Sequence, residues 1–174
     1  MLRARLVSFN VLLVLAFILC LLPLTPVIES AATAPSPESF AIADDSQPQV
    51  TLLSQPVRIV DTRSGSGYLG AGQPLQGINS PRCYKLTERA GVPAEAKAVI
   101  VNLTAVGYTR DGWIAAYPYD PANTGVPSTS SVNYDTAENA IANFAIVKLG
   151  QGGQVCLTGS SPTNAIIDVS GYLR

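Results

Sequence analysis

Residues 58–63 (Arg-Ile-Val-Asp-Thr-Arg) and the glycine-rich stretch after them, residues 64–70, form the most distinctive polar segment of this 174-residue chain. Strict alternation along a strand places Asp61 on the same face as the apolar residues two and four positions before it, so a partly buried carboxylate is expected. A buried carboxylate must be paired or hydrogen-bonded, and Thr62, Arg63 and the amides of the glycine stretch are the natural partners.

Two interpretations of this segment stay open. It is either a structural ionic network that fixes the first strand of the domain, or a ligand or cation site at the glycine-rich stretch. The stretch lacks the Gly-Lys-Ser/Thr ending of a phosphate-binding loop. The sequence therefore does not support nucleotide binding.

Aromatic side chains give a second candidate site. Trp113 and Tyr117 fall on one face of a predicted strand, Tyr119 lies just beyond it, and Tyr108 lies in the preceding turn. Exposed aromatic rings of this kind stack on the apolar face of sugar rings, which predicts a carbohydrate-binding platform. The alternative is packing in the core or at the rim of the sheet, where Trp and Tyr are also common.

Oxygen-rich turns could hold calcium, because Asp120 with Asn123, and Asp135 with Glu138, supply hard ligands. Neither pair matches a defined calcium loop, and Asp and Asn are also ordinary turn residues. No other cofactor is indicated.

The chain contains no histidine, so neither a Ser-His-Asp nor a Cys-His catalytic site can be built. A pair of carboxylates could still hydrolyse a glycoside. The spacing of the available acidic residues selects no pair, however, so a small carboxylate-dependent hydrolase stays a minor alternative. The candidates are Asp61, Asp111, Asp135, Glu138 and Asp168.

The N-terminal segment is typical of a secretory signal peptide: Arg3 and Arg5 precede an apolar run over residues 6–24, and Ala-Thr-Ala follows at residues 32–34. We expect cleavage after residue 34 or, alternatively, after residue 32. An uncleaved membrane anchor is the competing interpretation, and either way the protein is expected to be secreted or held at the cell surface. Residues 35–55, rich in Pro, Ser and acidic side chains, are predicted to be a linker, and residues 56–174 one domain.

Cys83 and Cys156 are the only cysteines after the signal segment, and two cysteines in an exported domain most simply form one disulfide. A reactive thiol would need an activating base that the sequence does not supply. The formal charge is −1, with the 11 basic residues scattered along the chain, which argues against nucleic-acid binding.

Short apolar runs separated by Gly, Pro, Asn and Asp indicate an all-β fold, a single β-sandwich or jelly-roll-like domain. In residues 98–105 the alternation is clearest, with Val99, Val101, Leu103 and Ala105 on one face. Eight short strands are predicted, over residues 57–62, 82–86, 98–105, 113–117, 130–134, 141–149, 154–158 and 165–172.

The order of these motifs resembles a bacterial secreted domain family with an "R-L-L-D-T-R" opening, a central "N-V-T" strand and a closing "D-V-x-G-Y-F". The matching segments here are residues 57–67, 91–106, 112–118 and 127–173. The resemblance implies an extracellular all-β accessory module, often appended to cell-wall or other secreted hydrolases, without a known catalytic role. Relatives often carry a cysteine where this chain has Tyr119, so the resemblance implies that Cys83 takes over the bridge to Cys156.

The sequence thus predicts a non-catalytic binding or display module outside the cell, with cell-wall or extracellular polysaccharide as the leading partner. A second hypothesis is a self-associating surface or filament subunit. Its N-terminal tail, with apolar residues at alternate positions (Phe40, Ile42, Val50, Leu52), would add a strand to a neighbour's sheet. Membrane contact is expected only through an uncleaved N-terminal segment.

Overall fold

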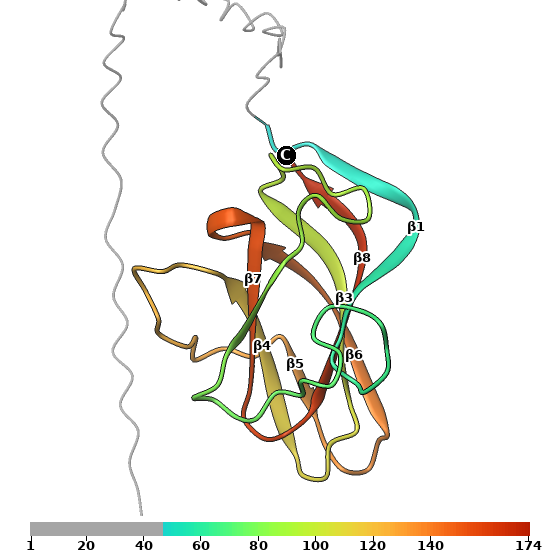
Figure 1. Cartoon of the computed structure of the whole chain (residues 1–174), viewed down its shortest axis with the longest axis vertical. Helices are drawn as coiled ribbons and strands as arrows, with labels where there is room; N and C mark the ends of the chain where they lie inside the picture. Colours follow the sequence, from blue (N-terminus) through green and yellow to red (C-terminus); the bar gives the residue numbers. More distant parts are fainter. Residues whose placement is uncertain (1–46) are drawn as a thin grey trace, which may run out of the picture. The chain divides into compact units, whose positions relative to one another are not determined.

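The computed structural model describes residues 47–174 (Figure 1). The predicted signal peptide, the possible anchor and most of the predicted linker, with Phe40 and Ile42, lie outside the described residues. The elements are β1 (Val50–Asp61), β2 (Arg82–Lys85), β3 (Ala98–Val106), β4 (Gly112–Pro118), β5 (Val132–Tyr134), β6 (Ala140–Lys148), a short 3₁₀ turn η1 (Gln151–Gly153), β7 (Gln154–Gly159) and β8 (Asn164–Leu173).

The strands form two four-stranded antiparallel sheets, β1-β8-β3-β6 and β2-β7-β4-β5, which confirms the predicted all-β sandwich. The first strand pairs with the last, the second with the seventh, the third with the sixth and the fourth with the fifth. This nested pairing of first with last strand arises when one long antiparallel hairpin folds over into two sheets. It is the strand arrangement of a jelly roll.

The core lies between the two sheets. On β3, the predicted inward residues Val99, Val101, Leu103 and Ala105 are all at most 2% exposed. Full burial of a side chain such as Leu103 contributes roughly 2 kcal/mol through removal of its apolar surface from water. The alternation that the sequence shows in this strand therefore sets which face of the sheet is buried.

Strand β1 begins at Val50, so the sheet starts inside the segment predicted to be linker. Val50 pairs with Leu173 and Leu52 with Gly171, both in strand β8 of the same chain. The prediction that Val50 and Leu52 belong to a tail free to pair with a neighbour is therefore wrong. The end of β8 needs a partner for its main-chain groups, and the main chain of β1 supplies it.

A β-bulge at Ile59 changes the face on which Asp61 lies. Arg58 pairs with Asp168, but the next register pair is Val60 with Ile167, so Ile59 is an extra residue. Asp61 therefore shares the outer face with Arg58, and the prediction that it faces the same way as Ile59 is wrong. A bulge shifts the two-residue period by one position, which strict alternation cannot anticipate.

The predicted disulfide is present: Cys83 on β2 lies directly opposite Cys156 on β7 and is bonded to it, 73 positions apart in the sequence. This bridge is compatible with an oxidising, extracytoplasmic compartment. In residues 47–174 there is no helix with the length and apolar character needed to cross a membrane.

Candidate functional site

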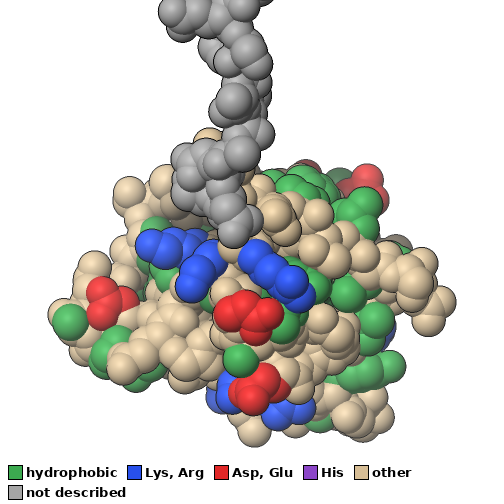
Figure 2. Space-filling model, turned by 90° about the horizontal axis from the view of Figure 1, so that it is seen from above, with side chains coloured by type: hydrophobic (Ala, Val, Ile, Leu, Met, Phe, Trp, Pro, Cys, Tyr) green, Lys and Arg blue, Asp and Glu red, His purple; other side chains and the backbone are tan. Residues whose placement is uncertain are grey.

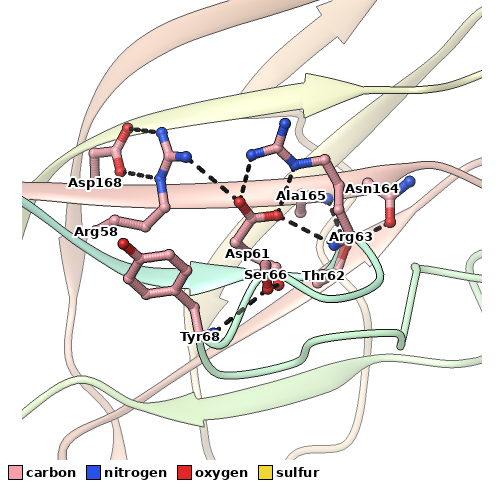
Figure 3. A network of polar contacts seen from close by, with 9 residues as sticks. All are labelled: Arg58, Asp61, Thr62, Arg63, Ser66, Tyr68, Asn164, Ala165 and Asp168. Carbon is pink, nitrogen blue, oxygen red and sulfur yellow. Dashed lines mark hydrogen bonds and ion pairs between the residues drawn. The ribbon is translucent and has the colours of Figure 1, made fainter.

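Four charged side chains form one connected network (Figure 3). They are Arg58 and Asp61 on β1, Arg63 in the loop after β1, and Asp168 on β8. Arg58 holds Asp168 with two hydrogen bonds, Nε to Oδ1 at 2.8 Å and Nη2 to Oδ2 at 3.0 Å, and its Nη1 reaches Asp61 Oδ2 at 3.4 Å. Arg63 holds Asp61 in the same forked way, at 2.9 and 2.6 Å. The side chain of Asp61 is 1% exposed, because guanidinium groups cover it on the outer face of the sheet.

The glycine-rich segment folds back onto β1 and closes over this network. Leu69 donates its N–H to Ile59 O and accepts from Asp61 N, both at 3.1 Å, and Ser66 Oγ donates to Asp61 O at 2.7 Å. Thr62, predicted as a partner of Asp61, instead accepts from Ala165 N at 2.9 Å through its hydroxyl. These bonds tie the glycine-rich segment to β1, and Thr62, just before it, to β8, which supports the structural interpretation of this stretch.

The electrostatics of the network keep Asp61 ionised. Hydrogen bonds from the Arg63 side chain lower the pKa of Asp61, outweighing the opposite effect of burial. The hydrogen bond to Asp168 raises the pKa of Arg58, and the one to Asp61 raises the pKa of Arg63. A general acid needs a raised carboxyl pKa, so the direction of this shift argues against that role for Asp61.

An open groove of about 390 Å³ lies beside the network, and Arg58, Tyr68 and Arg89 line it together with apolar residues; we call it the Tyr68 groove. Figure 3 shows the Tyr68 ring next to Arg58. Tyr68 is 47% exposed. Arg89 is exposed and forms no ion pair with the described residues, so it is an uncompensated positive charge at this groove.

The turn that carries Arg89 is strained on both sides of it. Glu88 and Ala90 have φ values of 60° and 49°, in the left-handed region that non-glycine residues rarely adopt. Hydrogen bonds from Glu88 N to Val92 O (2.7 Å) and from Val92 N to Arg89 O (2.8 Å) hold the turn. Such strain costs about 1–3 kcal/mol per residue and is concentrated at binding sites.

The predicted aromatic platform is not continuous. Trp113 and Tyr117 share the outer face of β4, but Ala115 between them is 2% exposed. Its neighbour in β7, Thr158, donates to the carbonyls of Gly77 and Ile78, so the loop before β2 crosses the face at this point.

Tyr108, predicted to extend the platform, lies elsewhere in the fold. It stacks on Tyr134 of β5, with ring centroids 4.3 Å apart and an interplanar angle of 26°. Tyr134 belongs to the buried core, and Tyr108 packs against that core. The four predicted aromatic residues therefore do not form one surface. Tyr108 packs on the core through Tyr134, and the loop at Gly77 and Ile78 lies between Trp113 and Tyr117.

Tyr117 and Tyr119 line a small cavity of about 90 Å³ beside the disulfide, together with Asp120 and Asn123. Asp120 Oδ1 accepts from Ala122 N at 2.9 Å, and Asn123 Oδ1 accepts from Gly125 N at 3.1 Å. These two candidate calcium ligands thus serve as turn caps.

The second calcium candidate, Asp135 with Glu138, has the same local geometry. Asp135 Oδ1 accepts from Ala137 N at 2.9 Å, and Glu138 N donates to Asp135 O at 3.3 Å. Residues 47–174 contain no cluster of three or more acidic or Cys side chains suited to a metal ion.

Basic residues that are scattered in the sequence gather at one end of the sandwich. Lys97, Lys148 and Arg174, at the ends of β3, β6 and β8, line a cavity of about 620 Å³ next to residues 47–49. Figure 2 shows Lys and Arg side chains on this end with acidic ones between them. Arg174 lies 3.5 Å from Glu95, so part of the charge is compensated.

Comparisons with models of known protein families and with curated proteins find no match to this chain. The resemblance to the secreted domain family therefore stays a prediction from its motifs. The geometry adds one relation between those motifs, since Arg58 of the opening motif pairs with Asp168 of the closing motif.

Proposed function

We propose that the domain is a non-catalytic extracellular or cell-envelope module that binds an acidic polysaccharide in the Tyr68 groove. The observation that carries this proposal is the half-exposed side chain of Tyr68 in a groove that Arg58 and Arg89 also line. The aromatic face suits the C–H face of a sugar ring, and the unpaired Arg89 suits a carboxylate on it.

The site is also preorganised, which favours binding of a rigid sugar. Asp168 holds Arg58 by two bonds, and the main-chain bonds of Leu69 hold the segment that carries Tyr68. Groups that are fixed before binding lose less conformational entropy when the ligand arrives. The jelly-roll fold occurs in lectin domains, but the fold alone does not assign a function.

The hydrolase alternative has less support. A glycosidase needs one carboxylic acid that can donate a proton and a second carboxylate facing it across the sugar. Asp61 and Asp168 are bridged by one guanidinium group, that of Arg58, and Asp61 is 1% exposed. The arrangement leaves no room for a sugar between the two carboxylates.

Affinity measurements with oligogalacturonate, and with its neutral carboxyl-reduced form as the control ligand, test the proposal. We expect binding of the acidic form and at least about fivefold weaker binding after Tyr68→Ala or Arg89→Ala. Trp113→Ala and Arg110→Ala, at sites away from the groove, serve as matched controls and leave affinity unchanged. Equal affinity for both sugars, absence of binding, or loss of binding in Trp113→Ala would refute the proposal.

A further inference from the structure

Strand β6 is the one long edge strand in the described part of the chain that has no protection against pairing. It lies at the edge of its sheet, and its main chain is hydrogen-bonded only to β3. The other edges are guarded: β2 and β5 have four and three residues, and β1 has two register shifts and contains Pro56. Short strands, bulges and proline are the usual means by which proteins prevent edge pairing.

The outer face of β6 is entirely apolar from residue 140 to residue 146. Its side chains are Ala140, Ala142, Phe144 and Ile146, and all four are exposed. Phe144 is 64% and Ile146 57% exposed. Lys148 is the only charged residue in this nine-residue strand. A long apolar edge whose one charge stands at its end is the kind of surface that associates with another strand.

We propose that β6 pairs antiparallel with β6 of a second copy of this chain, which joins two sheets into one continuous eight-stranded sheet. The sequence of the strand is complementary to itself when the Asn143 residues of the two copies face each other. Phe144 then lies opposite Ala142 of the second copy and Ile146 opposite Ala140, so each large side chain meets a small one.

Charge complementarity fixes the same register. In this alignment, Lys148 faces the turn of the second copy that contains Glu138, two positions before β6 begins. The two-fold axis therefore brings Lys148 and Glu138 together twice, as two ion pairs. A register with the two Phe144 residues facing each other would instead place Lys148 opposite Ala140. The side chain of Asn143 donates to Ser131 O at 2.8 Å and points toward the other sheet, so it does not obstruct the centre.

Such a contact is two-fold symmetric and closes at the dimer. The opposite edge, β1, carries the bulges and Arg58, so it does not continue the sheet into a filament. The contact also lies apart from the Tyr68 groove, because β1 and β6 are the two opposite edges of the sheet. The dimer would therefore present two grooves, which increases avidity for a polymer with repeated binding sites.

Sedimentation velocity over a range of concentrations tests the dimer on the protein as isolated from its host. We expect a monomer–dimer equilibrium that Phe144→Lys shifts to monomer, because it places a charge at the centre of the contact. Leu52→Lys, an equally exposed apolar residue on the opposite edge, is the matched control and leaves the dimer intact. Tyr68→Ala also leaves it intact, so failure of the sugar-binding proposal is distinguishable from failure of this one.

Charge reversal tests the register. Lys148→Glu or Glu138→Lys alone weakens dimerisation about tenfold, because two ion pairs become two repulsive contacts, and the double reversal restores it. A native chain that sediments as a monomer at all concentrations, or a Phe144→Lys variant that stays dimeric, overturns the proposal. A double reversal that fails to restore dimerisation overturns the Asn143-centred register on which it rests.

Discussion

Arg58 and Asp168 lie 110 positions apart in the sequence and are joined by two hydrogen bonds, of 2.8 and 3.0 Å, between neighbouring strands β1 and β8. The same guanidinium group reaches Asp61 at 3.4 Å. The first and last strands of the domain are thus connected on the outer face of the sheet by charged groups in addition to their main-chain ladder. This connection holds the strand from which the Tyr68 segment departs.

Removal of either partner of this pair should destabilise the domain. We expect Arg58→Ala and Asp168→Ala each to lower the free energy of unfolding by about 1–3 kcal/mol, because each leaves a partly buried charge without its partner. The double variant should cost less than the sum of the two, with a coupling of about 1 kcal/mol. Denaturant unfolding of the four proteins measures this, and strictly additive effects would contradict the role assigned to the pair.

Stability should decrease in acid because of Asp61. Its pKa in the folded domain is lowered by the Arg63 side chain, so its ion pairs stabilise the fold at pH values above the unfolded pKa of about 3.9. This stabilisation is lost as the pH falls from there through the folded-state pKa. Asp61→Asn should therefore show a smaller loss of unfolding free energy between neutral pH and about pH 3.

Denaturant unfolding across this pH range provides the measurement, and equal acid sensitivity of the native chain and Asp61→Asn would contradict the prediction. Where the variant does not fold, NMR titration of the Asp61 carboxyl carbon gives the same information. Titration of that carbon at or above the ordinary aspartate range would then be the contradicting result.

The disulfide should contribute strongly to stability. It closes a loop between residues 73 positions apart, which in the chain-entropy model corresponds to about 3–5 kcal/mol. We expect the double variant Cys83→Ala/Cys156→Ala to lose an unfolding free energy of that size while keeping its β-sheet circular dichroism under native conditions. A loss well below about 2 kcal/mol would show that the bridge is not a main source of stability.

Gly171 should not tolerate a side chain. A Cβ atom at this position would lie 2.6 Å from Thr51 O and 3.2 Å from Leu52 Cα, both backbone atoms of β1. Gly171→Ala should therefore push the start of β1 away from β8 and cost about 1–3 kcal/mol. Thermal unfolding against Ser170→Ala, at the neighbouring position, measures the effect, and equal melting temperatures for the two variants would contradict it.

The fold followed closely from the sequence because most strands keep the two-residue period. All eight predicted strands are present, and the four inward residues of β3 are buried as expected. The start of β1 was assigned to a linker able to pair with a neighbour, because its true partner, the end of β8, lies at the far end of the chain. The alternation of Val50 and Leu52 indicates a strand, but nothing in the local sequence shows that Leu173 and Gly171 of the same chain are their partners.

The candidate site was predictable only in part. The Asp61–Arg63 pair follows from local sequence, since the two residues are two positions apart. The role of Asp168 depends on strand order, and the face of Asp61 depends on a bulge. Tyr68 and Arg89 line the same groove because the glycine-rich segment folds back onto β1, which no periodicity indicates.

The central claim is that the Tyr68 groove binds an acidic sugar, and amide chemical-shift mapping by NMR with oligogalacturonate tests it most directly. The account predicts saturable shifts that cluster at Gly67, Tyr68, Leu69 and Arg89, with none from the carboxyl-reduced sugar. Shifts that cluster instead at Trp113 and Tyr117, or no shifts at saturating oligogalacturonate, would contradict it.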